Sequence, residues 1–373
     1  MNKRLLFIFA FVLLSCCIYG QRTHSLEIKL SGGKIIPHRL NMKSLAQPTV
    51  SGEINYYFTT HTDNFYDVKY RFPKQGFGIS YNYIWDHNVL GSAIAAYSFM
   101  DFSLFERQWF GLGLRANAGI AYMTRKYNVD TNPENIAVST NLCFHLNVSL
   151  NEVFKLPSGY EIKLSQGFMH YSNGNVLKPN LGLNDIFVSA ALSKDIQTCD
   201  YTKQRTDYQD NLSPHEAWIM GTCATSDEFS YDYNGRGGGY ICSTAAVGYC
   251  YQYGKIGKVG ASFDMLYDEN RKYFYYHDER GVVQLFDDFF YIVKFGVSVG
   301  HQLVYRRFEL ITYLGFYVYN RVWAYDWVYT RIGARYYVTD FMFLNLTLHA
   351  NGFKARYIES GIGFSWRRWK KSK

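Results

Sequence analysis

Hydrophobic and polar residues alternate along much of this chain with a period of two. In one stretch the large apolar side chains occupy every second position, with glycine, serine and asparagine between them: Phe77, Ile79, Tyr81, Tyr83 and Trp85. Residues 110–122 and 142–150 repeat the pattern. Because successive side chains of a β-strand point to opposite faces, this period predicts strands with one apolar and one polar face.

The alternation predicts two sets of eight strands, separated by a polar segment at 196–213. Several strands are longer than those of most globular proteins, and their length suits tilted strands that cross a bilayer. Apolar faces rich in tyrosine, phenylalanine and leucine favour contact with lipid over a globular core. The strands are expected near 25–31, 51–60, 76–86, 89–100, 108–123, 138–152, 159–172, 184–195, 214–224, 238–252, 256–268, 289–302, 305–319, 325–338, 341–351 and 354–367.

The N-terminus has the pattern of a secretion signal. Basic residues at 3–4 precede an apolar run at 5–14, which is too short to span a bilayer as a helix. We expect residues 1–20 to be a signal peptide that is cleaved after Gly20. Lipid attachment at Cys16 is the alternative, and in either case the chain leaves the cytoplasm.

Composition supports a membrane barrel. The 373 residues include 34 tyrosines, 28 phenylalanines and 31 glycines, although the mean hydropathy is only −0.21. Beyond the signal no apolar run is long enough for a transmembrane helix. We therefore expect an all-β, antiparallel outer-membrane β-barrel of about 14–16 strands.

One closed sheet is favoured over two eight-stranded barrels, because two barrels would need the segment at 196–213 to span between them. The expected division is a first barrel half at 21–198, which carries the motif described below, and a second half at 199–373, a degenerate repeat.

Charge and motifs restrict the partners. The net charge of +8 favours acidic partners, and for an exported chain lipid phosphates fit better than nucleic acid. A generally solvated basic surface is the alternative. Neither a dinucleotide-binding fingerprint nor a metal-ligand cluster lies on a consistent face, so no cofactor and no metal are expected. Whether the protein forms a homodimer is left open.

The segment at 160–185 carries the candidate chemistry. By the period-two rule His170 and Ser172 fall on the apolar face of the seventh strand, at its outer end if the chain starts in the periplasm. A polar pair facing lipid costs free energy unless it is hydrogen-bonded, and the pair is either catalytic or a set of interface polar residues without catalysis. Serine with histidine can form a nucleophile and its general base, and Asn173 with Gly174 could donate to the oxyanion.

The motif His170-x-Ser172-Asn173, with the loop and strand that follow, resembles the active-site segment of the PagL-type lipid A 3-O-deacylases. That resemblance implies an eight-stranded outer-membrane barrel with a serine triad on its membrane-facing surface. It also implies Ser172 as nucleophile, His170 as base, Asn173 and Gly174 near the oxyanion, and lipid A of lipopolysaccharide as substrate. As a motif it covers about 168–186.

One position departs from the family. Fourteen residues beyond the histidine the family has an acid, and this chain has Asn184. Parity places Asn184 on the lipid side, whereas Asp185 should point inward unless the strand starts with a bulge. An asparagine can orient an imidazole but cannot stabilise the imidazolium by charge, and a wrong tautomer costs about 10⁴ in rate. Asn184 and Asp185 both stay candidates for the third member.

Two functions follow. The first is an outer-membrane serine esterase that hydrolyses an ester-linked acyl chain of lipid A. The second is a non-enzymatic barrel, either a channel or an adhesion scaffold. In the second case a lumen would be lined by Arg115, Asn117, His145, Asn147, Arg331 and Arg335. His349 in the second half follows a similar local pattern, but its parity assigns it to the interior.

Overall fold

The computed structural model describes most of the chain. The described ranges are 22–61, 64–198, 212–227, 239–275, 282–321, 327–352 and 354–369. The predicted signal peptide, with Cys16, lies outside them. Within these ranges, none of the helices has the length and apolar character needed to cross a membrane.

The first barrel is closed by eight antiparallel strands in chain order, and β1 pairs with β8 from His24–Gln197 to Ile35–Asp185. Its strands are β1 (Arg22–Ile35), β2 (Pro48–Thr60), β3 (Lys74–Ile84), β4 (Ser92–Glu106), β5 (Phe110–Met123), β6 (Leu142–Leu156), β7 (Tyr160–Ser172) and β8 (Leu183–Gln197). Its short helices are η1 (Leu40–Leu45), α2 (Phe65–Lys69) and η2 (Pro157–Gly159).

The second barrel also has eight antiparallel strands and closes where β9 pairs with β18. Its strands are β9 (Leu212–Ser226), β10 (Tyr240–Gln252), β11 (Gly257–Asp268), β14 (Val293–Tyr305), β15 (Phe308–Tyr319), β16 (Val328–Tyr337), β17 (Met342–Asn351) and β18 (Lys354–Trp369). Between β11 and β14 lie η3 (Glu269–Lys272), α3 (Phe289–Ile292) and a small hairpin, β12 (Tyr273–Tyr275) with β13 (Val282–Gln284).

The all-β antiparallel fold and the sixteen barrel strands are confirmed, but the preference for one closed sheet is wrong. Each set of eight closes on itself, so the alternative of two eight-stranded barrels is the observed one. One edge of β8 pairs with β7 and the other with β1, so β8 has no unpaired edge for β9. The barrels fall within the predicted halves, 21–198 and 199–373, and their relation as repeats stays a prediction.

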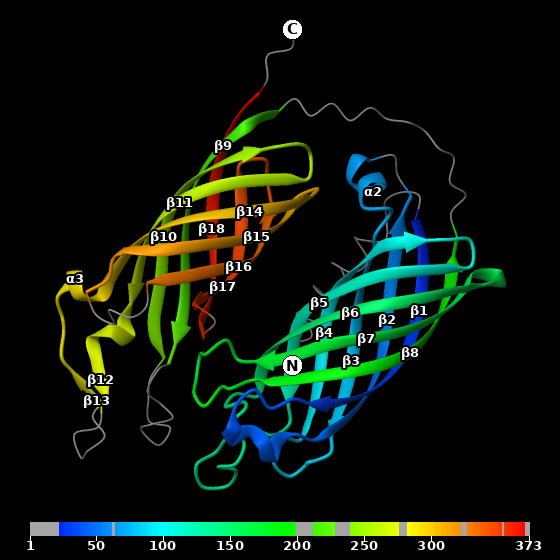
Figure 1. The fold of residues 1–373 in the computed structure, drawn as a ribbon, viewed down its shortest axis with the longest axis horizontal. Coiled ribbons are helices and arrows are strands. Elements are labelled where there is room, and N and C mark those ends of the chain that lie inside the picture. Colours follow the sequence, from blue (N-terminus) through cyan, green and yellow to red (C-terminus); the bar gives the residue numbers. More distant parts are fainter. Residues whose placement is uncertain are drawn as a thin grey trace, which may run out of the picture.

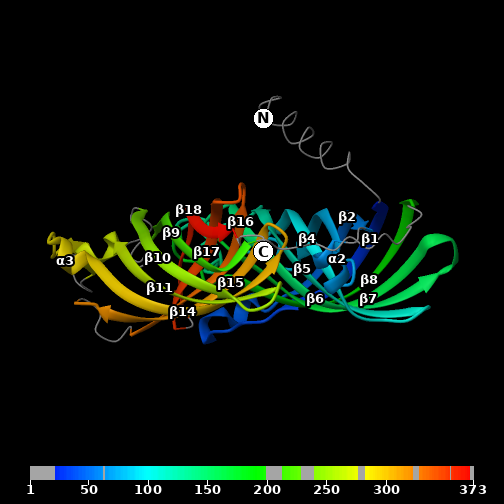
Figure 2. The same cartoon turned by 90° about the horizontal axis from the view of Figure 1, so that it is seen from above.

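The two barrels stand side by side in the same orientation (Figures 1 and 2). At the end that holds the β2–β3 connection, Asp67 of α2 accepts a hydrogen bond from Tyr305 of β14 at 3.0 Å and pairs with Arg306. Tyr70 donates to the backbone oxygen of Val304 at 3.0 Å. A second set of contacts, described with the site below, joins the opposite ends. The barrels therefore touch near both membrane faces.

Alternating burial follows the predicted parity. On β1 the outward Ile28 and Leu30 are 63% and 65% exposed, whereas Glu27 and Lys29, which alternate with them and point inward, are 1% and 2% exposed. Since a strand in lipid must present apolar side chains outward, this pattern is that of a membrane barrel whose polar residues fill the interior. His349 also points inward, as predicted, and lies 3.0 Å from the hydroxyl of Tyr317.

Ion pairs fill both interiors. In the first barrel Arg115 bonds to Glu27 at 2.6 Å and to Asp101 at 2.5 Å, and Lys163 reaches Glu27 at 2.6 Å. In the second barrel Arg331 donates to Glu359 at 2.7 Å. The residues proposed to line a lumen do face inward and all are buried: Arg115, Asn117, His145, Asn147, Arg331 and Arg335. The interiors are packed in the regions that these residues occupy.

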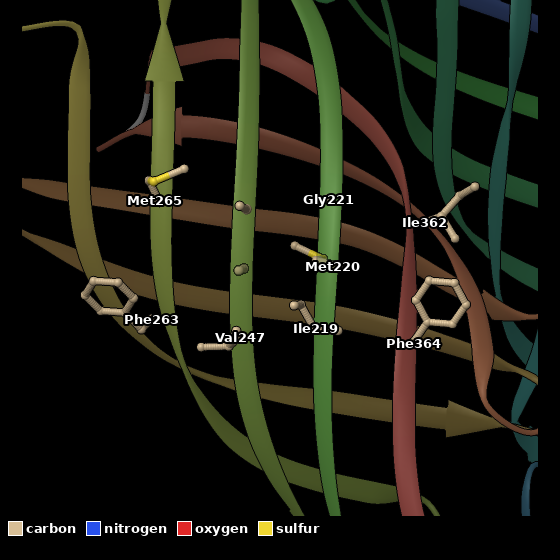
Figure 3. Close-up of a pocket in the computed structure, with 10 residues that line it drawn as sticks. Ile219, Met220, Gly221, Val247, Phe263, Met265, Ile362 and Phe364 are labelled. Atoms are coloured by element: carbon tan, nitrogen blue, oxygen red, sulfur yellow. The ribbon is translucent and has the colours of Figure 1, made fainter. Parts of the chain in front are cut away.

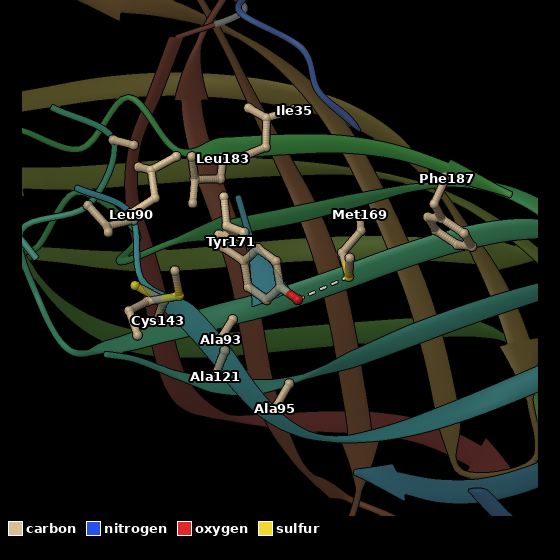
Figure 4. Packing of buried hydrophobic residues seen from close by; sticks show 14 of the residues in the cluster. Ile35, Leu90, Ala93, Ala95, Ala121, Cys143, Met169, Tyr171, Leu183 and Phe187 are labelled. Carbon is tan, nitrogen blue, oxygen red and sulfur yellow. Dashed lines mark hydrogen bonds between the residues drawn. The ribbon is translucent and has the colours of Figure 1, made fainter. Parts of the chain in front are cut away.

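At the outer end of the first barrel, an apolar cluster closes the interior beneath the β7–β8 loop (Figure 4). Tyr171 and Leu183 are each 1% exposed, and Tyr171 donates to the sulfur of Met169 at 3.1 Å. These inward residues alternate with the outward His170 and Ser172. Their packing fixes the backbone on which the candidate site stands.

We expect Glu27→Ala to lower the free energy of unfolding by about 3–5 kcal/mol, because Arg115 and Lys163 would then lose a buried counter-charge. The measurement is urea unfolding in detergent micelles followed by tryptophan fluorescence. The matched control is Glu106→Ala, which removes an exposed partner of Lys155 and should cost at most about 0.5 kcal/mol. Equal losses would contradict a stabilising interior network.

Candidate active site

Strand register brings the candidate histidine and asparagine together. His170 on β7 lies directly opposite Asn184 on β8, and both point outward. Nδ1 of His170 is 2.6 Å from Oδ1 of Asn184. An amide oxygen can only accept, so the ring proton of His170 lies on Nδ1 and leaves Nε2 as a proton acceptor.

Ser172 is the last residue of β7 and is half-buried on the same outward face as His170. In this structure it forms no side-chain hydrogen bond with any described residue, His170 included. The separation of about 6.6 Å expected between Cα atoms of residues i and i+2 still leaves the two side chains able to converge. Catalytic hydrogen bonds often tighten only when substrate binds.

The two predicted oxyanion donors differ in their surroundings. The backbone N–H of Asn173 donates to Oδ1 of Asn180 at 3.0 Å, and its side-chain amide donates to Ser139 and to the backbone oxygen of Leu177. Asn173 is therefore a buried support of the loop in this structure. The N–H of Gly174, by contrast, has no hydrogen-bond partner within the part of the chain that the structure describes.

The structure separates the two candidates for the third member. Asp185 points into the barrel, is 1% exposed, and accepts a hydrogen bond from Thr49 at 2.8 Å. It lies on the inner face of the sheet, whereas His170 lies on the outer face. Of these two candidates, Asn184 is the one that contacts the histidine.

Sequence reasoning missed His38. Its Nδ1 lies 3.1 Å from Nδ2 of Asn184, and the backbone N–H of Ile36 donates to the backbone oxygen of Asn184 at 2.7 Å. His38 lies in the connection between β1 and η1, and the pairing of β1 with β8 brings it to the site. No motif signals this residue, because the contact joins the connection after β1 to β8, the last strand of the first barrel. Burial and the nearby charge of Arg39 lower the pKa of His38.

The second barrel contacts the loop that follows Ser172. The side-chain amide of Asn175 donates to Oγ of Ser226 at 3.2 Å and to the backbone oxygen of Arg356 at 3.0 Å. The N–H of Asp227 donates to the oxygen of Asn175 at 2.9 Å. The Ile358 side chain packs so closely on Gly174 that a Cβ there would lie 2.9 Å from it.

A groove on the outer wall begins beside the site. Its volume is about 960 Å³, and it includes Phe168 and Ile186, which lie one outward position below His170 and Asn184. Gly32, on the outward face of β1, leaves open space in it. A second, smaller groove on the second barrel is walled by outward apolar side chains such as Ile219, Val247 and Phe364 (Figure 3). The residues that line this second groove include no serine, histidine or carboxylate.

Two family models match the chain, one for each barrel. Residues 51–193 match Lipid A 3-O-deacylase (PagL), and residues 215–369 match the C-terminal domain of acyloxyacyl hydrolase. The first barrel thus matches the PagL model, and the two matched ranges together span both barrels. His170, Ser172 and Asn184 all lie within the first match, so the resemblance to the PagL family inferred from the motif is confirmed. The protein is located in the bacterial outer membrane.

Several solved structures show likeness at low identity. The outer membrane enzyme PagL is 12% identical, with a TM-score of 0.33 over 44% of this chain and 97% of that chain. Neisserial surface protein A is 10% identical, with a TM-score of 0.31 over 48% and 100%. A mutant porin of Rh. blastica is 9% identical, with a TM-score of 0.19 over 93% and 100%. Among curated proteins, none matches this sequence significantly.

Gly182→Ala should displace His170. Gly182 has a φ of +77°, and a Cβ there would lie 2.7 Å from Cε1 of His170. A displacement of about 1 Å can cost about 10² in rate, so we expect a loss of that order in deacylation with the barrel still folded. The assay is release of fatty acid in detergent, with heat-modifiable electrophoretic mobility as the test of folding.

The matched control is Gly254→Ala, which also places a side chain at positive φ but meets no atom within 4 Å. It should keep activity within about threefold, because its backbone strain is far from the site. Equal loss in the two variants would show that strain, and not the contact with His170, is responsible.

Proposed function

We propose that this protein hydrolyses an ester-linked acyl chain of lipid A, with Ser172 as nucleophile and His170 as general base. The observation that carries the proposal is the outward-facing pair His170–Asn184 beside Ser172, at the loop end of β7 and on the wall that faces lipid. Two polar side chains at this position cost free energy unless they are used or paired. In the outer leaflet lipopolysaccharide presents its acyl esters to this wall.

The geometry supports a two-stage acyl transfer. Nε2 of His170 takes the proton of Ser172 as Oγ attacks the ester carbonyl carbon, and the N–H of Gly174 donates to the oxygen that becomes negative. The bond between the acyl carbon and the sugar oxygen then breaks, and the leaving sugar alkoxide takes the proton from His170. A water molecule, deprotonated by His170, attacks the acyl-serine ester, and the released Ser172 recovers the proton.

The groove beside Phe168 and Ile186 supplies the apolar wall for the acyl chain under this proposal. It crosses the outer wall over β1, β8, β7 and β6, one outward position nearer the middle of the membrane than His170. A bound acyl chain would thus keep its ester at the catalytic pair while its tail stays in an apolar environment. Binding of remote parts of the substrate positions the reacting bond.

Asn184 sets the expected efficiency. Its amide holds Nδ1–H of His170 and so fixes the useful tautomer, but it provides no negative charge to stabilise the imidazolium. We infer a slower enzyme than one with a carboxylate at this position.

The homodimer left open by the sequence stays a prediction, and sedimentation in detergent would measure it.

The alternative of a channel is disfavoured by the packed ion pairs of both interiors, in which Arg115 is 2% exposed and Arg331 is 3% exposed. A scaffold without catalysis would tolerate loss of Ser172. The mutation of that residue therefore separates the two functions.

Ser172→Ala should abolish deacylation, lowering the rate by about 10³ or more, because the nucleophile is lost. The measurement is mass spectrometry of lipid A from cells that express either form. Ser165→Ala is the matched control, since Ser165 lies on the same strand but faces the interior. An identical acylation pattern for wild type and Ser172→Ala would sink the enzyme proposal.

A further inference from the structure

We propose that His38 is a positioning residue that sets the orientation of the Asn184 amide, and through it the tautomer of His170. This proposal rests on the proposed function. It starts from a difference between the two possible side chains at position 184. A carboxylate offers two equivalent oxygens, whereas an amide has one accepting end and one donating end.

A half-turn of the Asn184 amide would be destructive. With Nδ2 towards His170, Nδ1 of the ring would have to accept, and the ring proton would move to Nε2. Ser172 could then no longer pass its proton to that nitrogen. The site therefore needs a group that distinguishes the two ends of the amide.

His38 occupies the place of that group. Its Nδ1 lies 3.1 Å from Nδ2 of Asn184, on the side of the amide away from His170. A ring nitrogen that accepts there pairs with the donating end and turns the oxygen to His170. Neutral histidine favours the tautomer with its proton on Nε2, which leaves Nδ1 as an acceptor.

The backbone keeps His38 in place. The N–H of Ile36 donates to the backbone oxygen of Asn184 at 2.7 Å, which extends the β1–β8 pairing by one step towards His38. The lowered pKa of this histidine also favours the neutral, accepting ring. The order His38–Asn184–His170 thus runs across three segments, β1's outer connection, β8 and β7.

The test compares His38→Ala with His38→Asn. Asparagine places an oxygen close to where Nδ1 lies and can accept from Asn184, whereas alanine cannot. We expect His38→Ala to lower kcat by about tenfold or more with KM within about twofold, and His38→Asn to restore most of kcat. His87→Ala, a histidine on another outer loop that stacks on Tyr83, is the control and should stay near wild type.

A carboxylate at 184 provides a second arm. In an Asn184→Glu background the loss caused by His38→Ala should shrink to within about twofold, because a carboxylate has no wrong end. Unchanged kcat in His38→Ala, or equal loss in His38→Ala and His38→Asn, would overturn the positioning role. Activity that survives Ser172→Ala would instead overturn the proposed function, so the two failures are distinguishable.

A separate set of contacts carries a second inference about the other half of the chain. We propose that the second barrel holds the Gly174–Asn175 turn, and with it the N–H assigned to the oxyanion. Both residues have positive φ, +69° and +67°. Such a turn is costly for asparagine and needs support from its surroundings.

That support comes from β9 and β18. Ser226 and the backbone oxygen of Arg356 accept from the Asn175 amide, and Ile358 packs on Gly174. Ile358 is half-buried, whereas Ile362, also outward on β18, is 50% exposed. The second barrel is thereby part of the catalytic unit and not only a membrane anchor.

Ile358→Ala should lower kcat by about tenfold and speed hydrogen–deuterium exchange of residues 173–177, because the turn loses its packing. Ile362→Ala is the matched control on the same strand and should change neither measurement by more than about twofold. Asn175→Gly keeps the positive φ at no cost and removes only the amide, so it should behave like Ile358→Ala. Wild-type kcat and exchange in Ile358→Ala and Asn175→Gly would overturn the proposal.

Discussion

Every backbone N–H and C=O that lies in lipid must find a partner within the protein, and this constraint shapes the whole molecule. Each set of eight strands satisfies it by closing on itself, β1 with β8 and β9 with β18. Closure then fixes which faces point outward. It also fixes the neighbours of β8. On one side β7 places His170 against Asn184, and on the other the connection after β1 places His38 against it.

The position of the polar pair follows from strand parity alone and does not depend on closure. Period-two alternation placed His170, Ser172 and Asn184 on the outer wall and Asp185 inside, since parity is a local property of one strand. It also assigned His349 to the interior. The motif and its family resemblance were readable because all its residues lie within one hairpin.

Features that depend on long-range pairing could not be predicted in this way. The number of barrels depends on which strand β8 selects, and the alternation of β8 is equally compatible with β1 or β9 as partner. His38 is far from the motif in sequence and reaches Asn184 only after closure. The side-chain amide of Asn173 donates to Ser139 on another loop, and the local sequence does not reveal that contact.

The contacts between the barrels lie at both ends of the strands, Asp67 with Tyr305 at one end and Asn175 with Ser226 at the other. Two attachment points along the membrane normal prevent either barrel from spinning about its own axis. The wall that carries Ser172 therefore has a fixed orientation relative to the second barrel. Lipids diffuse laterally in the leaflet, and the second barrel blocks one side of the wall that carries Ser172. A lipid can therefore reach that wall only from the directions that the second barrel leaves open.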